Sequence, residues 1–276
     1  MNRHSAALEL RRVALPSGVA LEVAEQGPRG GTPLLLLHGA TDSWLSFEPV
    51  LPHLDPDRHV VVPSQRGHGD SDKPAQGYRT DDFVADLVAL IEALGLPPVI
   101  VAGHSMGSTH ALRLAMDRPD LVRGVVGLAA FASYGDKPEL VQWIADVVRP
   151  LADPVSRELA QEFQASTLAR PIAPGLLPRM VEQSLRVPAH AWRGLFDGLL
   201  EDDFSDRVSR IAAPVLLIAA EADAYVPAAD ATRLQRAIPH ARIETWAGAG
   251  HALHWEEPER CAARLVAFAR EVDALP

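Results

Sequence analysis

The sequence predicts an α/β protein with a mostly parallel central sheet, covered by helices on both faces and interrupted by one helical insertion. The 276 residues are 47% hydrophobic and 22% charged, a balance that allows a sizeable core. Short continuous apolar runs alternate with helical patterns along the chain. Such runs are typical of parallel strands buried on both faces. The alternation breaks once, between residues 132 and 210.

Seven strands are expected. Residues 18–25, "GVALEVAE", alternate in polarity and indicate an exposed or edge strand. The other six segments are apolar and end in small or polar residues, which indicates buried strands. They lie at 32–39, 58–64, 97–104, 121–131, 213–223 and 241–250.

Helices are expected between these strands. Residues 80–95 carry apolar side chains at helical spacing, with Thr80 or Asp81 as the N-cap and Gly95 as the stop. A second helix follows at 106–119, closed by Pro119, and the last helix covers roughly Glu257 to Val272. Cys261, the only cysteine, falls on the buried side of that helix, so we interpret it as a core residue rather than a nucleophile.

The segment 132–210 contains helical patterns and several prolines but no convincing strand. It is therefore predicted to be a helical insertion, and residues 1–131 with 211–276 form the core domain. The insertion carries the aromatic residues Trp143, Phe163, Trp192 and Phe196.

Composition restricts the partners. A net charge of −10 argues against nucleic-acid binding through a basic surface. The N-terminus lacks the apolar core of a signal peptide, and no run approaches the roughly 20 apolar residues of a membrane span. A cytoplasmic protein with a small-molecule substrate is expected. Histidine spacing does not fit zinc and no phosphate loop is present, so neither a metal nor a cofactor is predicted. Nothing in the sequence predicts the oligomeric state.

The most informative motif is Gly103-His104-Ser105-Met106-Gly107, which fits G-x-S-x-G between an apolar strand and a helix. A nucleophile on such a sharp turn needs small neighbours, which explains a glycine on each side. The start of the following helix can then stabilise a negatively charged oxygen through its backbone N–H groups.

A serine nucleophile needs a base, and the base needs an acid to orient it. Asp223 ends the strand at 213–223, and His251 lies in a loop of small residues after the strand at 241–250. Both positions lie beyond the C-terminal ends of parallel strands, where ligands bind in such sheets.

Several ordered motifs together resemble the α/β-hydrolase fold enzymes over nearly the whole chain. They are "LLLLHGA", "QRGHGDSDKP", "GHSMGS", "EADAYVP" and "AGAGHALHWEEPE". The resemblance implies that Ser105 is the nucleophile, Asp223 the acid and His251 the base. Some members of this family carry the acid after the preceding strand, where Asp136 is the alternative. It implies an oxyanion hole formed by the backbone N–H groups of Ala40 and Met106. It also implies that the insertion follows the sixth strand and acts as a cap over the site.

Candidate pocket residues come from the motif loops and the insertion. His38 is expected to pack under the oxyanion loop, His104 to hold the turn, and His254 either to line the pocket or to face solvent. Aromatic residues of an insertion usually form core, but a cap should turn some of them toward a cavity. The remaining candidates for the pocket wall are Phe131, Trp143, Trp192 and Val226.

These observations predict a serine hydrolase that cleaves an ester or lactone of a small, uncharged, mainly apolar substrate. Thioesterases, carbon–carbon bond hydrolases, perhydrolases and cofactor-free oxygenases of the same fold are alternatives. Ala252 follows His251 where ring-cleavage hydrolases carry tryptophan, which weakens the carbon–carbon alternative. A small-molecule receptor that keeps the triad without turnover is the alternative from another class.

Overall fold

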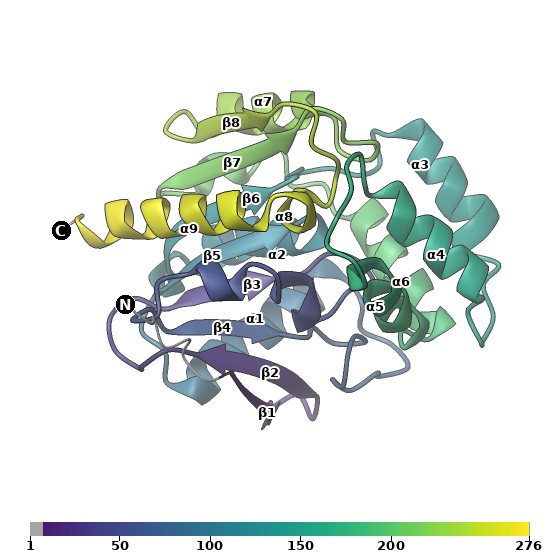
Figure 1. Ribbon diagram of the computed structural model, residues 1–276, viewed down its shortest axis with the longest axis horizontal. Coiled ribbons are helices and arrows are strands. Elements are labelled where there is room, and N and C mark those ends of the chain that lie inside the picture. The colour runs from purple at the N-terminus through teal and green to yellow at the C-terminus, as the bar shows by residue number, and fades with distance from the viewer. Residues whose placement is uncertain (1–7, 276) are drawn as a thin grey trace.

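The computed structural model describes residues 8–275, and its centre is one eight-stranded sheet (Figure 1). The strand order is β1-β2-β4-β3-β5-β6-β7-β8. Strands β1 and β2 run antiparallel to their neighbours, and all other pairs are parallel. The predicted fold class is therefore confirmed. The strands are Glu9–Ala14, Ala20–Gln26, Leu34–Leu37, Val60–Pro63, Val99–His104, Val122–Leu128, Val215–Ala220 and Arg242–Trp246.

Strand β1 is the one element of the sheet that the sequence did not predict. Its segment, ELRRVA, is polar, and only Val13 is buried. An edge strand that is exposed on both faces carries no apolar run, and it forms here because its backbone pairs with β2 from Glu9 to Ala14. With β1 included, β6 is the sixth strand.

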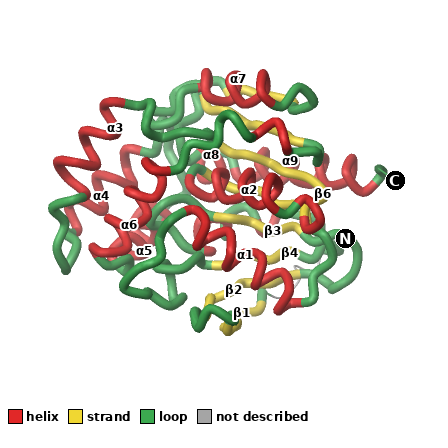
Figure 2. Tube along the Cα trace, turned by 180° about the vertical axis from the view of Figure 1, so that it is seen from behind, coloured by secondary structure: helices red, strands yellow, loops and turns green. Residues whose placement is uncertain are grey.

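Helices cover both faces of the sheet. Helix α9 (Pro258–Asp273) crosses one face (Figure 1), and α1 (Thr80–Leu94) and α2 (Met106–Asp117) cover the other (Figure 2). The core is split accordingly: Leu34 and Leu36 pack on the α9 side, and Leu35 and Leu37 on the α1 and α2 side. This alternation is what a strand buried on both faces requires. The shorter helices of the core are α7 (Ala228–Ala237) and α8 (Leu253–Glu256).

Two local predictions have different outcomes at helix α1. The helix ends at Gly95 as predicted, in a left-handed conformation with φ +61°. The predicted N-cap is wrong: Arg79, not Thr80 or Asp81, precedes the first helical residue. The Arg79 N–H donates to the Asp82 carboxylate at 3.0 Å, and that bond satisfies the free backbone donor.

Four α-helices, a π-helical turn and a 3-10 turn (Val208–Arg210) lie between β6 and β7, and this described part of the chain contains no strand. They gather at one end of the sheet, beyond the C-terminal ends of the parallel strands (Figures 1 and 2). We call residues 132–210 the helical insertion. Its helices are α3 (Pro138–Trp143), followed by a π-helical turn (Ile144–Val148), then α4 (Arg157–Ser166), α5 (Leu176–Leu185) and α6 (Ala189–Glu201).

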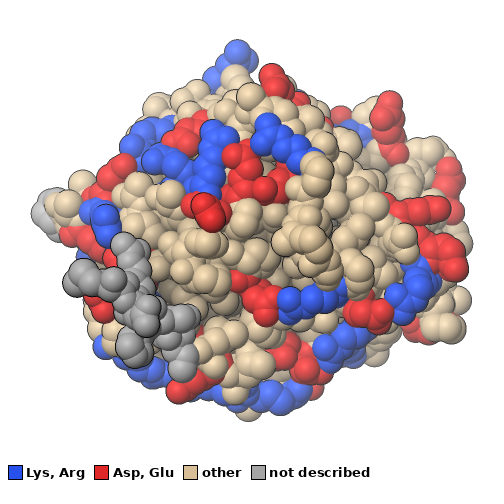
Figure 3. All heavy atoms as spheres, viewed as in Figure 1, with Lys and Arg blue, Asp and Glu red and all other residues tan. Residues whose placement is uncertain are grey.

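Cys261 is fully buried beside α9 core residues, as predicted, and burial raises the pKa of its thiol to about 12. On the face shown in Figure 3, basic and acidic side chains are interspersed. Of the helices in residues 8–275, none has both the length and the apolar character that crossing a membrane requires.

Candidate active site

Ser105 lies on a strained turn between β5 and α2. Its φ of 50° and ψ of −118° are far from the conformations that L-residues prefer. The turn is held on both sides: the Ser105 N–H donates to the Leu128 carbonyl at 2.9 Å, and the Ser105 carbonyl accepts from the Ser108 N–H at 2.8 Å. Strain of this kind persists only where surrounding contacts enforce it.

The two glycines of the motif are required by close backbone approach. A Cβ atom on Gly103 would lie 2.0 Å from the Gly107 carbonyl oxygen. One on Gly107 would lie 2.3 Å from the Leu37 carbonyl oxygen of β3. Both contacts involve backbone atoms, which cannot move aside as a flexible side chain can. The motif therefore fixes how α2 sits against the sheet.

The replacement Gly107→Ala is expected to destabilise the protein by about 3 kcal/mol or more, because the added methyl group must displace β3 or α2. Urea unfolding measures the change in free energy. Gly135→Ala is the matched control, since its Cβ would meet the Leu200 carbonyl oxygen at an ordinary 3.5 Å. Equal stability of the two variants would contradict the tight-turn geometry.

Asp223 and His251 form a hydrogen-bonded pair. His251 Nδ1 lies 2.9 Å from Asp223 Oδ1 and 2.8 Å from Oδ2. Asp223 Oδ1 also accepts from the backbone N–H groups of Tyr225 at 2.8 Å and Val226 at 2.9 Å. Burial alone would raise the pKa of Asp223, but His251 and the two N–H donors outweigh it and hold the pKa below its ordinary value. Asp223 is therefore a carboxylate that orients the His251 ring.

The alternative acid, Asp136, lies elsewhere. Its carboxylate forms ion pairs with Lys137 at 2.8 Å and with Arg233 at 2.9 Å, and it is partly exposed. Because it contacts cations on the surface and not His251, the geometry favours Asp223 as the partner of the imidazole.

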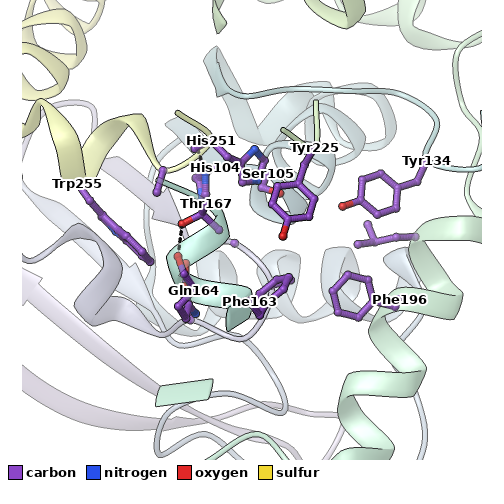
Figure 4. A pocket seen from close by; sticks show the side chains of 15 residues that line it. His104, Ser105, Tyr134, Phe163, Gln164, Thr167, Phe196, Tyr225, His251 and Trp255 are labelled. Atoms are coloured by element: carbon purple, nitrogen blue, oxygen red, sulfur yellow. Dashed lines mark hydrogen bonds between the residues drawn. The ribbon is translucent and has the colours of Figure 1, made fainter. Parts of the chain in front are cut away.

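Ser105 and His251 line the same cavity (Figure 4), but within residues 8–275 no hydrogen bond joins them. Hydrogen bonds between a nucleophile and its base are often long without substrate and shorten when substrate binds. With Nδ1 donating to Asp223, the other nitrogen of the ring, Nε2, is available as the base.

The predicted oxyanion donors flank Ser105. Met106 is the first residue of α2, so its N–H has no acceptor within the helix. Ala40 lies on the loop after β3 and lines the cavity beside Gly39 and Ser105. In the described part of the chain, neither N–H donates to a backbone carbonyl in the turns and loops. Both groups are thus free to bind an oxygen of a ligand.

The free volume of the cavity is about 20 Å³, enough for about one water molecule, so binding a substrate requires the cavity wall to move. Figure 4 shows the rings of Phe163 (α4) and Phe196 (α6) across from Ser105 and His251. Helices of the insertion therefore form one wall and loops of the core form the other. The remaining lining residues are Gly39, Ala40, Asp42, His104, Tyr134, Gln164, Thr167, Leu199, Tyr225, Ala252 and Trp255.

Among the predicted pocket residues, His104 lines the cavity, His38 packs under the oxyanion loop as expected and does not line the cavity, and the placement of His254 and Val226 is corrected. His38 is fully buried; its Nδ1 donates to the Gly39 carbonyl at 2.8 Å, and its Nε2 accepts from the Gln65 N–H at 2.9 Å. His254 is buried against Ser46, with 2.9 Å between Nε2 and Oγ. Val226 contributes its backbone N–H to Asp223. These residues support the cavity wall from behind.

The placement of three predicted aromatic residues is also corrected. Phe131 stacks on Tyr134 with 4.6 Å between ring centroids, and Trp143 stacks on Phe163 with 5.7 Å. Trp192 is fully buried and meets Phe163 edge-on. Each lies one layer behind a ring that does line the cavity. The sequence indicated the aromatic cluster but not which of its members face the cavity.

Sequence analysis missed Asp42, which lines the cavity and is only 3% exposed. Its Oδ1 accepts from Gln164 Nε2 at 3.0 Å, and its Oδ2 accepts from Ser46 Oγ at 3.0 Å. Burial raises its pKa to about 6, although Gln164 and Ser46 lower it in part. The signal in the sequence was an acidic residue two positions after Ala40, on the loop that the motif already placed at the site.

Asp42→Asn is expected to stabilise the protein increasingly as pH rises. In the folded state Asp42 binds its proton up to about pH 6, whereas in the unfolded chain it releases it near pH 3.8. Between these values the folded state holds the extra proton, so wild type loses stability as pH rises, by about 3 kcal/mol in total. Asparagine does not titrate and avoids that loss.

Urea unfolding of wild type and Asp42→Asn at pH 4, 5, 6 and 7 measures this difference. Asp206→Asn is the matched control because the Asp206 side chain is 84% exposed. A stability difference between wild type and Asp42→Asn that stays constant from pH 4 to pH 7 would contradict a raised pKa.

The chain belongs to the alpha/beta hydrolase fold family, whose sequence model matches residues 32–258. It is 29% identical over 255 residues to a 2-(acetamidomethylene)succinate hydrolase of Mesorhizobium japonicum, covering 87% of this chain and 88% of that one. It is 32% identical over 257 residues to the magnesium-chelatase 30 kDa subunit of Rhodobacter capsulatus, covering 84% of each.

Among solved structures, an esterase of Exiguobacterium antarcticum superimposes with a TM-score of 0.83, 22% identity, and coverage of 94% of this chain and 98% of that one. At this identity the likeness shows the fold alone. The proteins that this chain resembles in sequence or in fold are named as an esterase, as another hydrolase and as a chelatase subunit, so the reaction has to be argued from the site.

Proposed function

We propose that the protein is a serine hydrolase that cleaves a carboxylic ester or lactone of a small, uncharged substrate. The observation that carries the proposal is the position of Ser105, on a strained turn in the same cavity as the hydrogen-bonded His251–Asp223 pair. A serine, a histidine and a buried carboxylate in this arrangement serve acyl transfer on several unrelated folds.

In the proposed reaction, His251 Nε2 takes the Ser105 hydroxyl proton while Oγ bonds to the substrate carbonyl carbon. The N–H groups of Ala40 and Met106 hold the oxygen that becomes negative, and one such donor is worth roughly 3–4 kcal/mol. His251 then gives its proton to the leaving oxygen, and the bond from carbonyl carbon to that oxygen breaks. A water molecule, deprotonated by His251, then attacks the acyl carbon. The bond from that carbon to Oγ breaks, His251 returns its proton to Oγ, and the acid is released.

The position of the helical insertion supports its proposed role as a cap over the active site. Its residues Phe163, Phe196 and Leu199 supply apolar surface opposite Ser105, suited to the hydrocarbon part of a substrate. Among the residues of the range 8–275 that line the cavity there is neither a lysine nor an arginine. We accordingly treat residues 132–210 as the substrate-selecting part, and residues 1–131 with 211–276 as the catalytic core.

Labelling with a small fluorophosphonate tests the proposal. The reagent loses fluoride and bonds to a serine oxygen only where that oxygen is activated. Intact-mass analysis is expected to show one adduct on wild type, one on the control Ser205→Ala, and none on Ser105→Ala. Unlabelled wild-type protein that is folded would contradict an assembled nucleophile and would favour a receptor without turnover.

A further inference from the structure

The cavity wall holds a buried hydrogen-bond acceptor without a partner. His104 Nε2 lies 2.9 Å from the His251 backbone carbonyl oxygen. A carbonyl oxygen only accepts, so Nε2 carries the proton of this ring. Burial also lowers the pKa of His104 to about 3, which keeps the ring neutral. His104 Nδ1 is therefore an unprotonated acceptor, and it is buried with no hydrogen-bond partner in the described chain.

Asp42 supplies further acceptors in the same cavity. An ionised carboxylate offers about four lone-pair positions. Gln164 and Ser46 each donate to one oxygen of Asp42, so about two positions are left. The same two donors fix the carboxylate group in place. Above pH 6 Asp42 therefore presents a rigid, negatively charged acceptor to a ligand.

The two acceptors converge beside the oxyanion loop. The position of a Cβ atom on Gly39 would lie 2.8 Å from His104 Nδ1 and 3.4 Å from Asp42 Oδ2. Both atoms therefore lie on the same side of the Gly39 Cα atom. Gly39 directly precedes the proposed oxyanion donor Ala40. His104 directly precedes Ser105 in the chain, and Asp42 lines the same cavity as Ser105, so the part of a substrate next to the scissile carbonyl is the part that can contact these acceptors.

The charges around the cavity also favour a ligand that donates hydrogen bonds over one that carries a carboxylate. An ionised Asp42 repels a substrate carboxylate, and no lysine or arginine among the lining residues offsets that repulsion. The name of the Mesorhizobium relative gives a succinate as the substrate, and a succinate carries two carboxylates. We therefore expect this chain to act on a different kind of substrate. Buried acceptors left unpaired are costly, so a ligand that supplies donors gains affinity.

We propose that Asp42 and His104 form an acceptor subsite that selects substrates carrying an N–H or O–H group two or three bonds from the scissile carbonyl and rejects those carrying a carboxylate there. This inference rests on the proposed hydrolase function. It narrows the uncharged esters to hydroxy-substituted ones and adds ammonium-substituted esters, which an ionised Asp42 attracts.

Four phenyl esters of matched chain length test the subsite. They are the esters of 3-hydroxypropanoic acid, 3-aminopropanoic acid, butanoic acid and the monoester of succinic acid, which place a hydroxyl, an ammonium, a methyl or a carboxylate at the same position. At pH 7.5 wild type is expected to show kcat/KM at least about 10-fold higher for the hydroxyl and ammonium esters than for the methyl ester. The carboxylate ester is expected to fall at least about 10-fold below the methyl ester.

The variant Asp42→Asn keeps the size of the side chain and removes its charge. We expect it to lose most of the preference for the ammonium ester and to accept the carboxylate ester about as well as the methyl ester. Asp206→Asn, at an exposed position, is the matched control and should keep the wild-type order. Because each result is a ratio measured on one protein sample, partial misfolding of a variant does not change it.

Binding to Ser105→Ala separates this inference from the proposed reaction. The methyl esters of the same four acids are titrated against it by calorimetry, and the same order of affinities is expected without turnover. That order combined with no hydrolysis by wild type would refute the hydrolase proposal and leave the subsite in place. Hydrolysis and binding that both ignore the end group would overturn the subsite and leave the hydrolase proposal standing.

Discussion

Replacing Ser105 with alanine is expected to lower kcat for a short-chain phenyl ester by about 10⁴-fold or more, while the fold is retained. The reason is that alanine removes Oγ, the atom proposed to bond to the substrate carbonyl carbon. The proposed oxyanion donors Ala40 and Met106 stay in position, so a residual rate above that of water is expected. Stability should change by no more than about 1 kcal/mol, because the turn is held by backbone hydrogen bonds that alanine keeps.

Stopped assays on freshly purified Ser105→Ala, with thermal unfolding as the check on folding, measure both quantities. Pre-treatment with the fluorophosphonate removes any contaminating wild-type enzyme, whose traces would otherwise set the apparent rate. A folded variant that keeps more than a hundredth of the wild-type kcat after this treatment would show that Ser105 is not the nucleophile.

Replacing Asp223 with asparagine is expected to lower kcat by about 10⁴-fold. The carboxylate accepts from His251 Nδ1 at 2.8 Å and so leaves Nε2 unprotonated toward Ser105. An asparagine amide can donate to Nδ1 instead, which would place the proton on Nε2 and remove the base. KM should change little, because Asp223 is not among the residues that line the cavity.

Asp136→Asn is the matched control for this prediction, and it is expected to keep kcat within about 2-fold of wild type. Its ion pairs with Lys137 and Arg233 are partly exposed, and such pairs contribute little to stability. Steady-state kinetics on both variants decide between the two acids. A severe loss of kcat in Asp136→Asn with little loss in Asp223→Asn would reverse the assignment.

Features set by local chemistry were predictable from the sequence. The strands buried on both faces carry continuous apolar runs. The turn at Ser105 requires its two glycines, because backbone atoms of β3 and α2 leave no room for a side chain at either position. Asp223 and His251 follow strand ends, so the topology of a parallel sheet brings them to one edge. Strand β1 was missed because its stability comes from pairing with β2 and not from its own residues.

The wall of the cavity was far less predictable because it depends on how helices pack. Trp143 and Phe163 are both aromatic and stack on each other, yet only Phe163 faces Ser105 across the cavity. Their order in that stack depends on the crossing of α3 and α4, which no spacing in the sequence specifies. Asp42 was missed for another reason: an aspartate in a loop is usually solvated, whereas this one is 3% exposed and accepts a hydrogen bond from Gln164, which lies in a distant part of the chain.

The hydrogen bond between Gln164 and Asp42 has a consequence for the exchange of ligands. Gln164 lies on α4 of the insertion and Asp42 on the loop after β3, so their hydrogen bond links the insertion wall of the cavity to the core wall. Any outward swing of α4 that lets product escape must first break it. A charged carboxylate is the stronger acceptor, and Asp42 is charged above about pH 6. The residence time of a bound product would therefore lengthen from mildly acidic to neutral solution.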